Sequence, residues 1–451
     1  MKAASSARKS SANRPRFPLA VVLALGSLAT SVQAQSLVEL YEAARGFDAT
    51  YLAARSQYDA SLAQAAQARA GLLPQAGLGA AASWARREVN NGGFGGTNDS
   101  QSTTLSASQP LYRPVNRLTN DQATLTMDIA KARLTLAEQD LIVRTTQAYF
   151  DVLAAQDTLT FVQAQKKAVS EQLAAAKRNF EVGTTTVTDS REAQARYDLV
   201  IAQEIAAEND LRVKKLALDQ LVGKASVAPK PLAAPVTLPP LVPADPQAWV
   251  AQAEAGHPVV LQATRGLEIA QLETQKAEAG HKPTLDLVGQ YQLARAPSSS
   301  AAIPGYVRNN TATVGVQFNL PLYAGGAIQN RVKETLALED KASTDLEGAK
   351  RSVSQATRSA YFGVLSGLSQ VKALEAAEAS SQSALDANQL GYQVGVRINI
   401  DVLNAQSQLF QTKRDLAQAR YNVLLGTLKL RQAAGTLTQQ DVEAINALLV
   451  K

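Results

Sequence analysis

The sequence predicts an α+β membrane protein of two similar halves, each with a long helical hairpin and a pair of β-strands. Three observations support this prediction. Residues 148–153, Ala-Tyr-Phe-Asp-Val-Leu, recur at 360–365 as Ala-Tyr-Phe-Gly-Val-Leu, an offset of 212 residues. In both halves the hydrophobic period changes from helical to alternating. The chain also begins with the features of an export signal.

Residues 1–34 have the pattern of a cleavable signal peptide. Five basic residues precede an apolar stretch at 17–29, and Val32-Gln33-Ala34 supplies small residues for a peptidase, so we expect cleavage before Gln35. The alternative is an uncleaved anchor, but the apolar stretch is too short to span a membrane. Cleavage lowers the formal charge from +6 to about +1, so the basic composition does not support nucleic-acid binding.

Each half opens with a predicted helix followed by two strands. The helices cover 35–70 and 248–279 and end at glycine. Apolar and polar residues then alternate at 76–84, 102–108, 285–293 and 311–320, with long polar loops inside each pair.

Strands of about ten residues with one apolar face are typical of an outer-membrane β-barrel. The alternative is a soluble sheet with one buried face, and the export signal favours the barrel. Four strands cannot close a barrel, and an edge exposed to lipid is not tolerated. We therefore expect several chains to share one barrel.

A very long helix follows each strand pair. It covers 115–182 in the first half and 327–394 in the second, and it stops at Gly183 or Gly395. A helix of this length spans about 100 Å, so it must project from the strands. Return helices are predicted at 189–221 and 401–434.

Proline marks each passage from strand to long helix, at 109–114 and 320–326. Tyr112 and Tyr323 occupy matched positions in these passages. We expect them at the membrane rim, where an amphipathic ring is favoured. The alternative is a turn with a packed tyrosine.

The chain divides into a signal peptide at 1–34, a first repeat at 35–223, a linker at 224–246, a second repeat at 247–440 and a short tail at 441–451. The linker is expected to be extended because it carries seven of the 17 prolines.

The residues that usually carry catalysis or bind metals are scarce. The chain has no cysteine and two histidines, His257 and His281, neither with partners at ligand spacing. Nucleotide-binding glycine motifs and nucleophile motifs are also missing. The sequence thus predicts no enzyme, no metal site and no cofactor.

Four segments together resemble the TolC family of outer-membrane channel proteins. They are Leu-Leu-Pro-Gln-Ala-Gly-Leu-Gly-Ala at 72–80, the 148–153 motif, Gly-His-Lys-Pro-Thr-Leu-Asp-Leu at 280–287 and Gly-Tyr-Gln-Val-Gly at 391–395. The resemblance covers about 36–440. It implies a homotrimer with a shared twelve-stranded barrel in the outer-membrane lipid, continued across the periplasm by a helical tunnel.

The resemblance also implies partners and a role. Such channels dock with a periplasmic adaptor protein and an inner-membrane pump of the RND or ABC type. They serve multidrug efflux or type I protein secretion. The pump and adaptor choose the cargo, so the sequence leaves the cargo undetermined.

The resemblance assigns roles at the helical tips. Asp401 matches an aspartate of the pore constriction, and Asn404 stands where the family has a second one. Asp189, Tyr392 and Arg397 match gate latches that hold the tip closed. The turns at Gly183, Thr184, Gly395 and Val396 are expected to contact the adaptor.

Each tip residue also has a local explanation. Asp401 can be a first-turn acid favoured by the helix dipole. Asp189 has capping-box spacing to Glu192, and Arg397 can be a solvated turn charge. Two other functions are considered for the whole chain: a trimeric outer-membrane stalk or adhesin, and a soluble periplasmic enzyme, for which no site is found.

Overall fold

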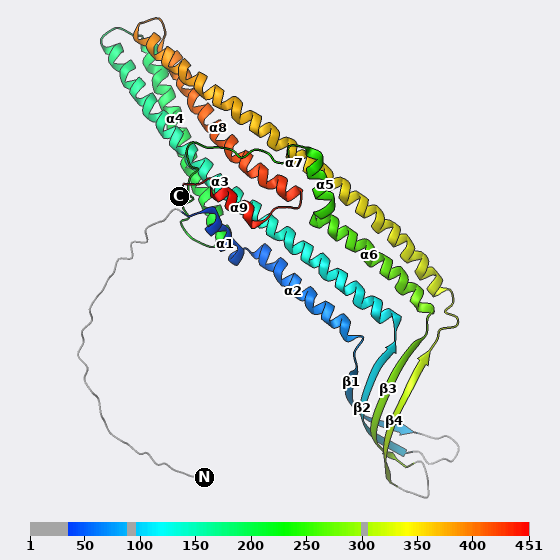
Figure 1. Ribbon diagram of the computed structural model, residues 1–451. Helices are drawn as coiled ribbons and strands as arrows, with labels where there is room; N and C mark the ends of the chain where they lie inside the picture. The colour runs from blue at the N-terminus through cyan, green and yellow to red at the C-terminus, as the bar shows by residue number, and fades with distance from the viewer. Residues whose placement is uncertain (1–34, 88–95, 299–304, 451) are drawn as a thin grey trace, which may run out of the picture. The chain divides into compact units, whose positions relative to one another are not determined.

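The computed structural model describes residues 35–87, 96–298 and 305–450. The predicted signal peptide lies outside these residues, as do the central parts of both strand-to-strand loops. The described elements, shown in Figure 1, are α1 (Leu37–Phe47), α2 (Ala49–Ala70), β1 (Gln75–Arg87), β2 (Gly96–Tyr112), α3 (Pro114–Glu181), α4 (Val187–Val222), α5 (Pro246–Gly256), α6 (Pro258–Glu278), a 3-10 turn (Ala279–His281), β3 (Thr284–Pro297), β4 (Tyr306–Asn319), α7 (Ala327–Gln393), α8 (Asn399–Ala433) and α9 (Gln439–Asn446).

The four strands form one antiparallel sheet in the order β1-β2-β3-β4. The β2–β3 pairing joins the two halves of the chain. One row across the sheet contains Leu78, Leu105, Tyr291 and Ala312, and the neighbouring row contains Gly77, Ser106, Gln290 and Thr313. The alternating pattern therefore separates an apolar face from a polar face, as predicted. The strands are longer than expected, at 13 to 17 residues.

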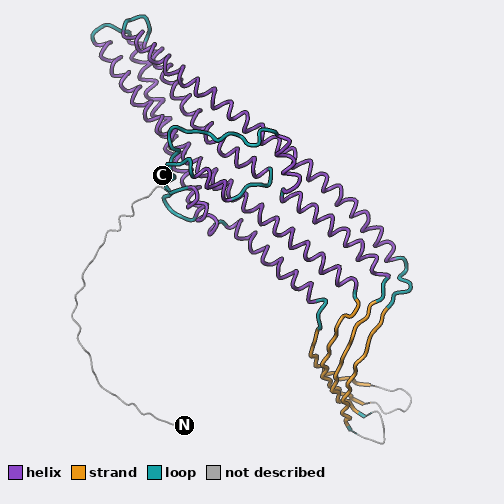
Figure 2. The backbone as a smooth tube through the Cα atoms, viewed as in Figure 1, coloured by secondary structure: helices purple, strands orange, loops and turns teal. Residues whose placement is uncertain are grey.

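The predicted long helices are confirmed, with 68 residues in α3 and 67 in α7. α3 packs against α4, α7 packs against α8, and α3 packs against α8. The order across this part of the bundle is α4, α3, α8 and α7. Figure 2 shows the strands at one end of these helices and the turns of both hairpins at the other.

The main hydrophobic core lies where α1, α9 and the linker pack on the middle of α3 and on the C-terminal parts of α4 and α8. Its fully buried residues include Tyr41, Leu141, Tyr149, Leu218 and Leu424. Burying one such leucine contributes about 1.5–3 kcal/mol. The core therefore fixes the middle of the bundle far from either tip.

The repeated Ala-Tyr-Phe motif attaches the linker to both halves. The Tyr149 hydroxyl donates to the Lys230 carbonyl oxygen at 2.8 Å. The matched Tyr361 hydroxyl donates to the Ala244 carbonyl oxygen. Val227 of the linker is buried in the main core. The linker is extended as expected, and it is also held against the helices.

The predicted single helices at 35–70 and 248–279 were wrong in one respect, because each is broken in two. Asp48 caps α2 by accepting from the Tyr51 amide at 2.8 Å, and it also accepts from Arg144 at 2.9 and 3.1 Å. In the second half Pro258 follows His257, and proline disfavours helical backbone in the residue before it. His257 is accordingly extended and caps α6.

The last segment holds a helix that the sequence analysis did not predict. α9 covers Gln439–Asn446 and buries Val442 and Ile445 in the main core. Thr438 and Asp441 form its capping box. The helix is too short to be stable alone, so its contacts with the core decide its presence.

Candidate gate and pore constriction at the helical tips

Both tips use the same backbone device to end their long helix. Gly183 and Gly395 have φ of +77° and +78°. The Thr184 amide donates to the Asn179 carbonyl at 2.8 Å, and the Val396 amide donates to the Gly391 carbonyl at 2.9 Å. Each glycine amide also donates to the carbonyl oxygen three residues earlier, Gly183 to Phe180 at 3.0 Å and Gly395 to Tyr392 at 3.1 Å. Together these bonds form a Schellman motif, in which glycine avoids the strain of left-handed backbone.

The first tip enters its return helix through a capping box. The Asp189 amide donates to the Thr186 hydroxyl at 3.3 Å, and the Asp189 carboxylate accepts from the Thr186 amide and hydroxyl at 3.1 and 2.9 Å. The proposed pairing of Asp189 with Glu192 was wrong. α4 begins at Val187, so Asp189 is the third helical residue rather than the cap.

The second tip has no equivalent cap. Ile398 occupies the N-cap position of α8 and forms no side-chain hydrogen bond. Asp401, the counterpart of Asp189, lies 3.7 Å from Arg397. The first-turn acid of the second tip thus pairs with a guanidinium instead of with its own helix start.

Polar contacts join the two hairpins near the tips. The Asn179 amide donates to the Tyr392 hydroxyl at 3.2 Å. The Gln172 amide donates to the Asn399 side-chain oxygen. Arg196 Nη2 donates to Asn404 Oδ1 at 2.8 Å. Sequence reasoning missed Asn179, Gln172 and Arg196, because a single sequence does not show which residues of different hairpins meet.

One groove contains all three predicted latch residues. It has a volume of about 530 Å³ and is lined by Asp189, Tyr392, Arg397 and both tip turns. Within the described residues these three side chains do not hydrogen-bond to one another. Each has another partner: Thr186 for Asp189, Asn179 for Tyr392 and Asp401 for Arg397.

The two predicted constriction residues line a second hollow, of about 610 Å³, with Arg397 and residues of α7. Asp401 and Asn404 lie on the same side of α8 because they are three residues apart. Their assignment to a pore constriction stays a prediction. Their place in a pore depends on the assembly and belongs to the proposal below.

At the strand end, Tyr112 closes β2 and Tyr323 lies in the loop after β4; both rings are exposed. Next to Tyr112, the Arg113 guanidinium donates to both carboxylate oxygens of Asp286 at 2.8 and 2.6 Å. This two-bond ion pair fixes the start of α3 to β3. The orientation of helix to sheet is therefore set by a charged contact.

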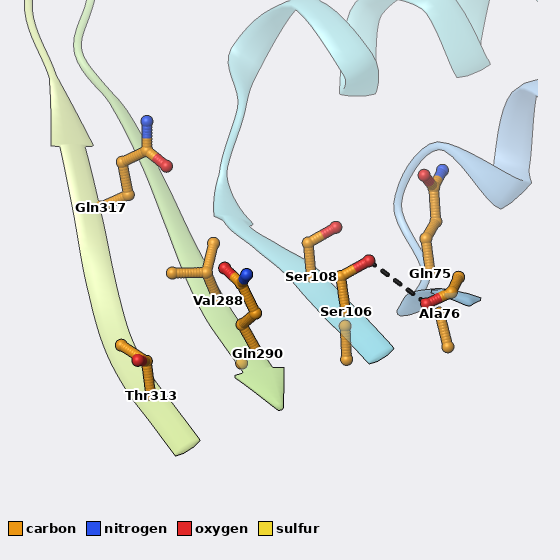
Figure 3. A pocket seen from close by; sticks show the side chains of 11 residues that line it. Gln75, Ala76, Ser106, Ser108, Val288, Gln290, Thr313 and Gln317 are labelled. Atoms are coloured by element: carbon orange, nitrogen blue, oxygen red, sulfur yellow. Dashed lines mark hydrogen bonds between the residues drawn. The ribbon is translucent and has the colours of Figure 1, made fainter. Parts of the chain in front are cut away.

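The polar face of the sheet is hollowed. Figure 3 shows Gln75, Ser106, Ser108, Gln290, Thr313 and Gln317 around a concavity of about 500 Å³. Ser106 donates to the Gly77 carbonyl oxygen at 3.3 Å. Amides and hydroxyls dominate this face, so it suits contact with water rather than with lipid.

The described residues contain no group of three His, Cys, Asp or Glu side chains placed to hold a metal. His257 has a structural role: its Nδ1 accepts from the Val259 amide at 3.1 Å, and burial lowers its pKa. No helix in the described part of the chain is both long and apolar enough to cross a membrane.

Sequence comparison relates the chain to known outer-membrane proteins. Residues 40–224 and 249–436 match the family described as outer membrane efflux protein. The chain is 34% identical over 436 residues to outer membrane protein TolC of Vibrio cholerae serotype O1, covering 96% of this chain and 98% of that one. It is 31% identical over 440 residues to the proteases secretion protein PrtF of Dickeya chrysanthemi, covering 95% and 94%.

Solved structures share the fold. The outer membrane protein VceC of Vibrio cholerae matches with a TM-score of 0.75 at 20% identity, covering 88% of this chain and 96% of that one. The Campylobacter jejuni CmeC outer membrane channel matches with a TM-score of 0.75 at 16% identity, covering 98% of each. Because the family match spans both halves and the relatives exceed 30% identity over nearly their full length, the chain belongs to the outer membrane efflux protein family and is a TolC-family channel.

Proposed function

We propose that this outer-membrane protein is the exit duct of a tripartite efflux pump or a type I secretion system, a passive conduit gated at its helical tips. Relatives are named for both roles: PrtF for protease secretion and BepC of Brucella suis for efflux. The chain would work as a homotrimer with a periplasmic adaptor and an inner-membrane pump of the RND or ABC type.

The main support for this proposal is that both edges of the four-stranded sheet are open. β1 and β4 each pair with one neighbour, so the outer edge of each has no partner strand among the described residues. The apolar face is also uncovered: Leu78 is 74% exposed and Val314 81%. Lipid tolerates an apolar face but not an open edge. β1 of one chain pairing with β4 of the next satisfies both conditions, and three chains then supply twelve strands.

The helices support the same arrangement independently. α4 and α7 lie at opposite flanks of the helical row, and both expose apolar side chains. On α4 they are Leu199, Ile205, Val213 and Leu216; on α7 they are Leu336, Leu338, Phe362, Leu365 and Leu390. Because the two flanks differ, they suit a head-to-tail contact, which closes into a ring when the rotation between neighbouring chains is a whole fraction of a turn. α4 and β1 lie on one side of the chain, and α7 and β4 lie on the other (Figure 1).

In this assembly the apolar face of the sheet meets lipid, with Tyr112 and Tyr323 at the membrane rim. The polar face of Figure 3 lines the lumen. At the far end, Asp401 and Asn404 face the narrowest part of the passage. Asp189, Tyr392 and Arg397 hold that end closed.

Opening requires a partner that prefers the open tip. The turns at Gly183, Thr184, Gly395 and Val396 end the hairpins and are the parts that an adaptor reaches first. Binding can open the channel only if the adaptor has higher affinity for the open form. The gate is therefore a conformational equilibrium and involves no chemistry on the cargo.

The test is single-channel recording in a planar bilayer, with Mg²⁺ added to each side in turn. We expect a small, steady conductance that Mg²⁺ blocks from one side. Asp401→Ala should remove the block, while Asp386→Ala, which removes an exposed carboxylate of α7, should leave it unchanged. Folded protein that forms no channel would contradict the conduit, and block that survives Asp401→Ala would contradict the constriction.

A further inference from the structure

Both α8 positions that the proposed function places at the constriction contact an arginine. Asp401 lies 3.7 Å from Arg397 of its own tip. Asn404 accepts a hydrogen bond of 2.8 Å from Arg196 of α4, in the other hairpin. The two contacts differ in charge: Arg397 meets a carboxylate, whereas Arg196 meets a neutral amide.

An amide oxygen can orient a guanidinium but cannot neutralise it. Arginine stays protonated at any pH the channel encounters. Arg196 forms no ion pair among the described residues, so each chain carries a positive charge beside Asn404, the position where the family has a second aspartate. Asparagine in place of aspartate at 404 thus removes one negative charge and also leaves the positive charge of Arg196 without a carboxylate partner there.

The groove beside Asn404 has the same charge character. It is lined by α3, α4 and α8 and has a volume of about 390 Å³. Its charged lining residues are Arg196 and Arg414, and no carboxylate lines it. Gln165 in its wall is 5% exposed, and its side-chain oxygen has no hydrogen-bond partner among the described residues. Arg414 donates to the Gln411 amide, another neutral group.

We propose that Arg196 is a specificity-determining residue of the passage. Held by Asn404, it places a positive charge one helical turn from Asp401, which weakens cation binding there and favours solutes with anionic groups. The inference rests on the proposed function, because it requires Asn404 to lie at the constriction. Arg196 acts by its charge, and Asn404 acts by fixing the position of that charge.

The first experiment removes the charge. In bilayers at about 0.1 M salt, charges interact over about 10 Å. We expect Arg196→Gln to lower the half-blocking Mg²⁺ concentration at least about threefold and to raise the K⁺/Cl⁻ permeability ratio at least about twofold. Arg196→Lys should behave like the unmodified protein, because it keeps the charge and loses only the planar hydrogen-bonding fork.

A matched control removes the same charge from the same helix. Arg212 is exposed on α4, sixteen residues beyond Arg196 and so about 24 Å away. This distance exceeds the screening length, so Arg212→Gln should change neither quantity. Equal effects of Arg196→Gln and Arg212→Gln would overturn the proposal.

The second experiment begins with a variant that keeps Arg196 and so keeps the contact between the hairpins. Asn404→Asp restores the carboxylate beside the guanidinium. We expect its half-blocking Mg²⁺ concentration to change less than about twofold, because Arg196 neutralises the new charge. Adding Arg196→Gln should then lower that concentration at least about tenfold.

If Asn404→Asp alone strengthens the block as much as the double variant, Arg196 does not control the charge at this position and the inference fails. Failure of the proposed function has a different signature: Asp401→Ala then leaves the block of the unmodified protein intact. Thermal unfolding and size-exclusion chromatography of each variant confirm that the channels compared are folded.

Discussion

The two helical tips have the same backbone and different side-chain chemistry. Both long helices end in a Schellman motif at a glycine with positive φ. At the first tip the polar groups that start the return helix are paired locally, because Thr186 and Asp189 bond to each other. The second tip has Ile398 at the corresponding cap, so Asp401 is available to Arg397. The first turn is therefore held by bonds within itself, whereas the second is held by an ion pair and by contacts to the other hairpin.

This difference assigns the two hairpins different tasks in the proposed gate. A self-capped turn keeps its shape when its neighbours move. A turn held by one ion pair and by contacts to the other hairpin can change partners at lower cost. The mobile part of the gate is thus expected at the second tip, around Tyr392 and Arg397.

The largest expected effect comes from removing the contacts of the second tip. Tyr392→Phe removes the hydroxyl that accepts from Asn179, and Arg397→Ser removes the partner of Asp401. We expect the double variant to raise single-channel conductance several-fold, because the closed tip loses interactions that the open one does not make. Unchanged conductance would reject the latch roles. Asp386→Ala, which removes an exposed carboxylate of α7, is the control and should leave conductance unchanged.

The next prediction removes the cap of the first tip and adds a cap to the second. Thr186→Val keeps the shape of the side chain but removes the hydroxyl that caps α4. It should lower the free energy of unfolding by about 1 kcal/mol. Ile398→Thr offers Asp401 a hydroxyl and should draw its carboxylate toward the start of α8, raising the half-blocking Mg²⁺ concentration about twofold. Ile398→Val supplies branching without a hydroxyl. Equal Mg²⁺ block in the Ile398→Thr and Ile398→Val variants would show that the cap does not govern Asp401.

The smallest expected effect concerns the middle of the hairpins. Asp157 of α3 accepts from the Tyr421 hydroxyl of α8 at 2.7 Å, and burial raises the pKa of this carboxyl. The matched position in the second half is Ser369, which is exposed and bonds only within its helix, to the Leu365 carbonyl. The halves therefore differ in the middle as well as at the tips.

The sign of the pH effect follows from the raised pKa. The protonated Asp157 carboxyl stabilises the folded protein relative to the ionised one. This stabilisation is fully present below the pKa of Asp157 in the unfolded chain and is lost as the pH rises through its pKa in the folded protein. Asp157→Asn removes this loss and retains an oxygen for Tyr421. The melting temperature of the variant relative to the unmodified protein should rise as the pH increases above about 4. Parallel melting curves at all pH values would contradict the burial argument.

Local sequence patterns were enough for the long elements. Helical periodicity predicted α3 and α7, and glycine predicted their ends, because these features depend on neighbours in the chain. Alternation predicted both faces of the sheet for the same reason. The break at Asp48 was missed although Asp48 caps α2 through a local bond to Tyr51. A single sequence does not show its ion pair with Arg144, which lies 96 residues away. The α9 helix was missed because its stability comes from the core rather than from its own sequence.

The candidate site shows the same division. The sequence alone determined that a glycine turn ends each long helix. It also determined that Asp189 follows the first turn and that Asp401 and Asn404 follow the second. Only the tertiary structure decided that Arg196 bonds to Asn404 and that Asn179 bonds to Tyr392, because these residues are 208 and 213 positions apart. Turns and helices arise from interactions over a few residues, whereas the charge environment of a passage arises wherever separate helices are packed together.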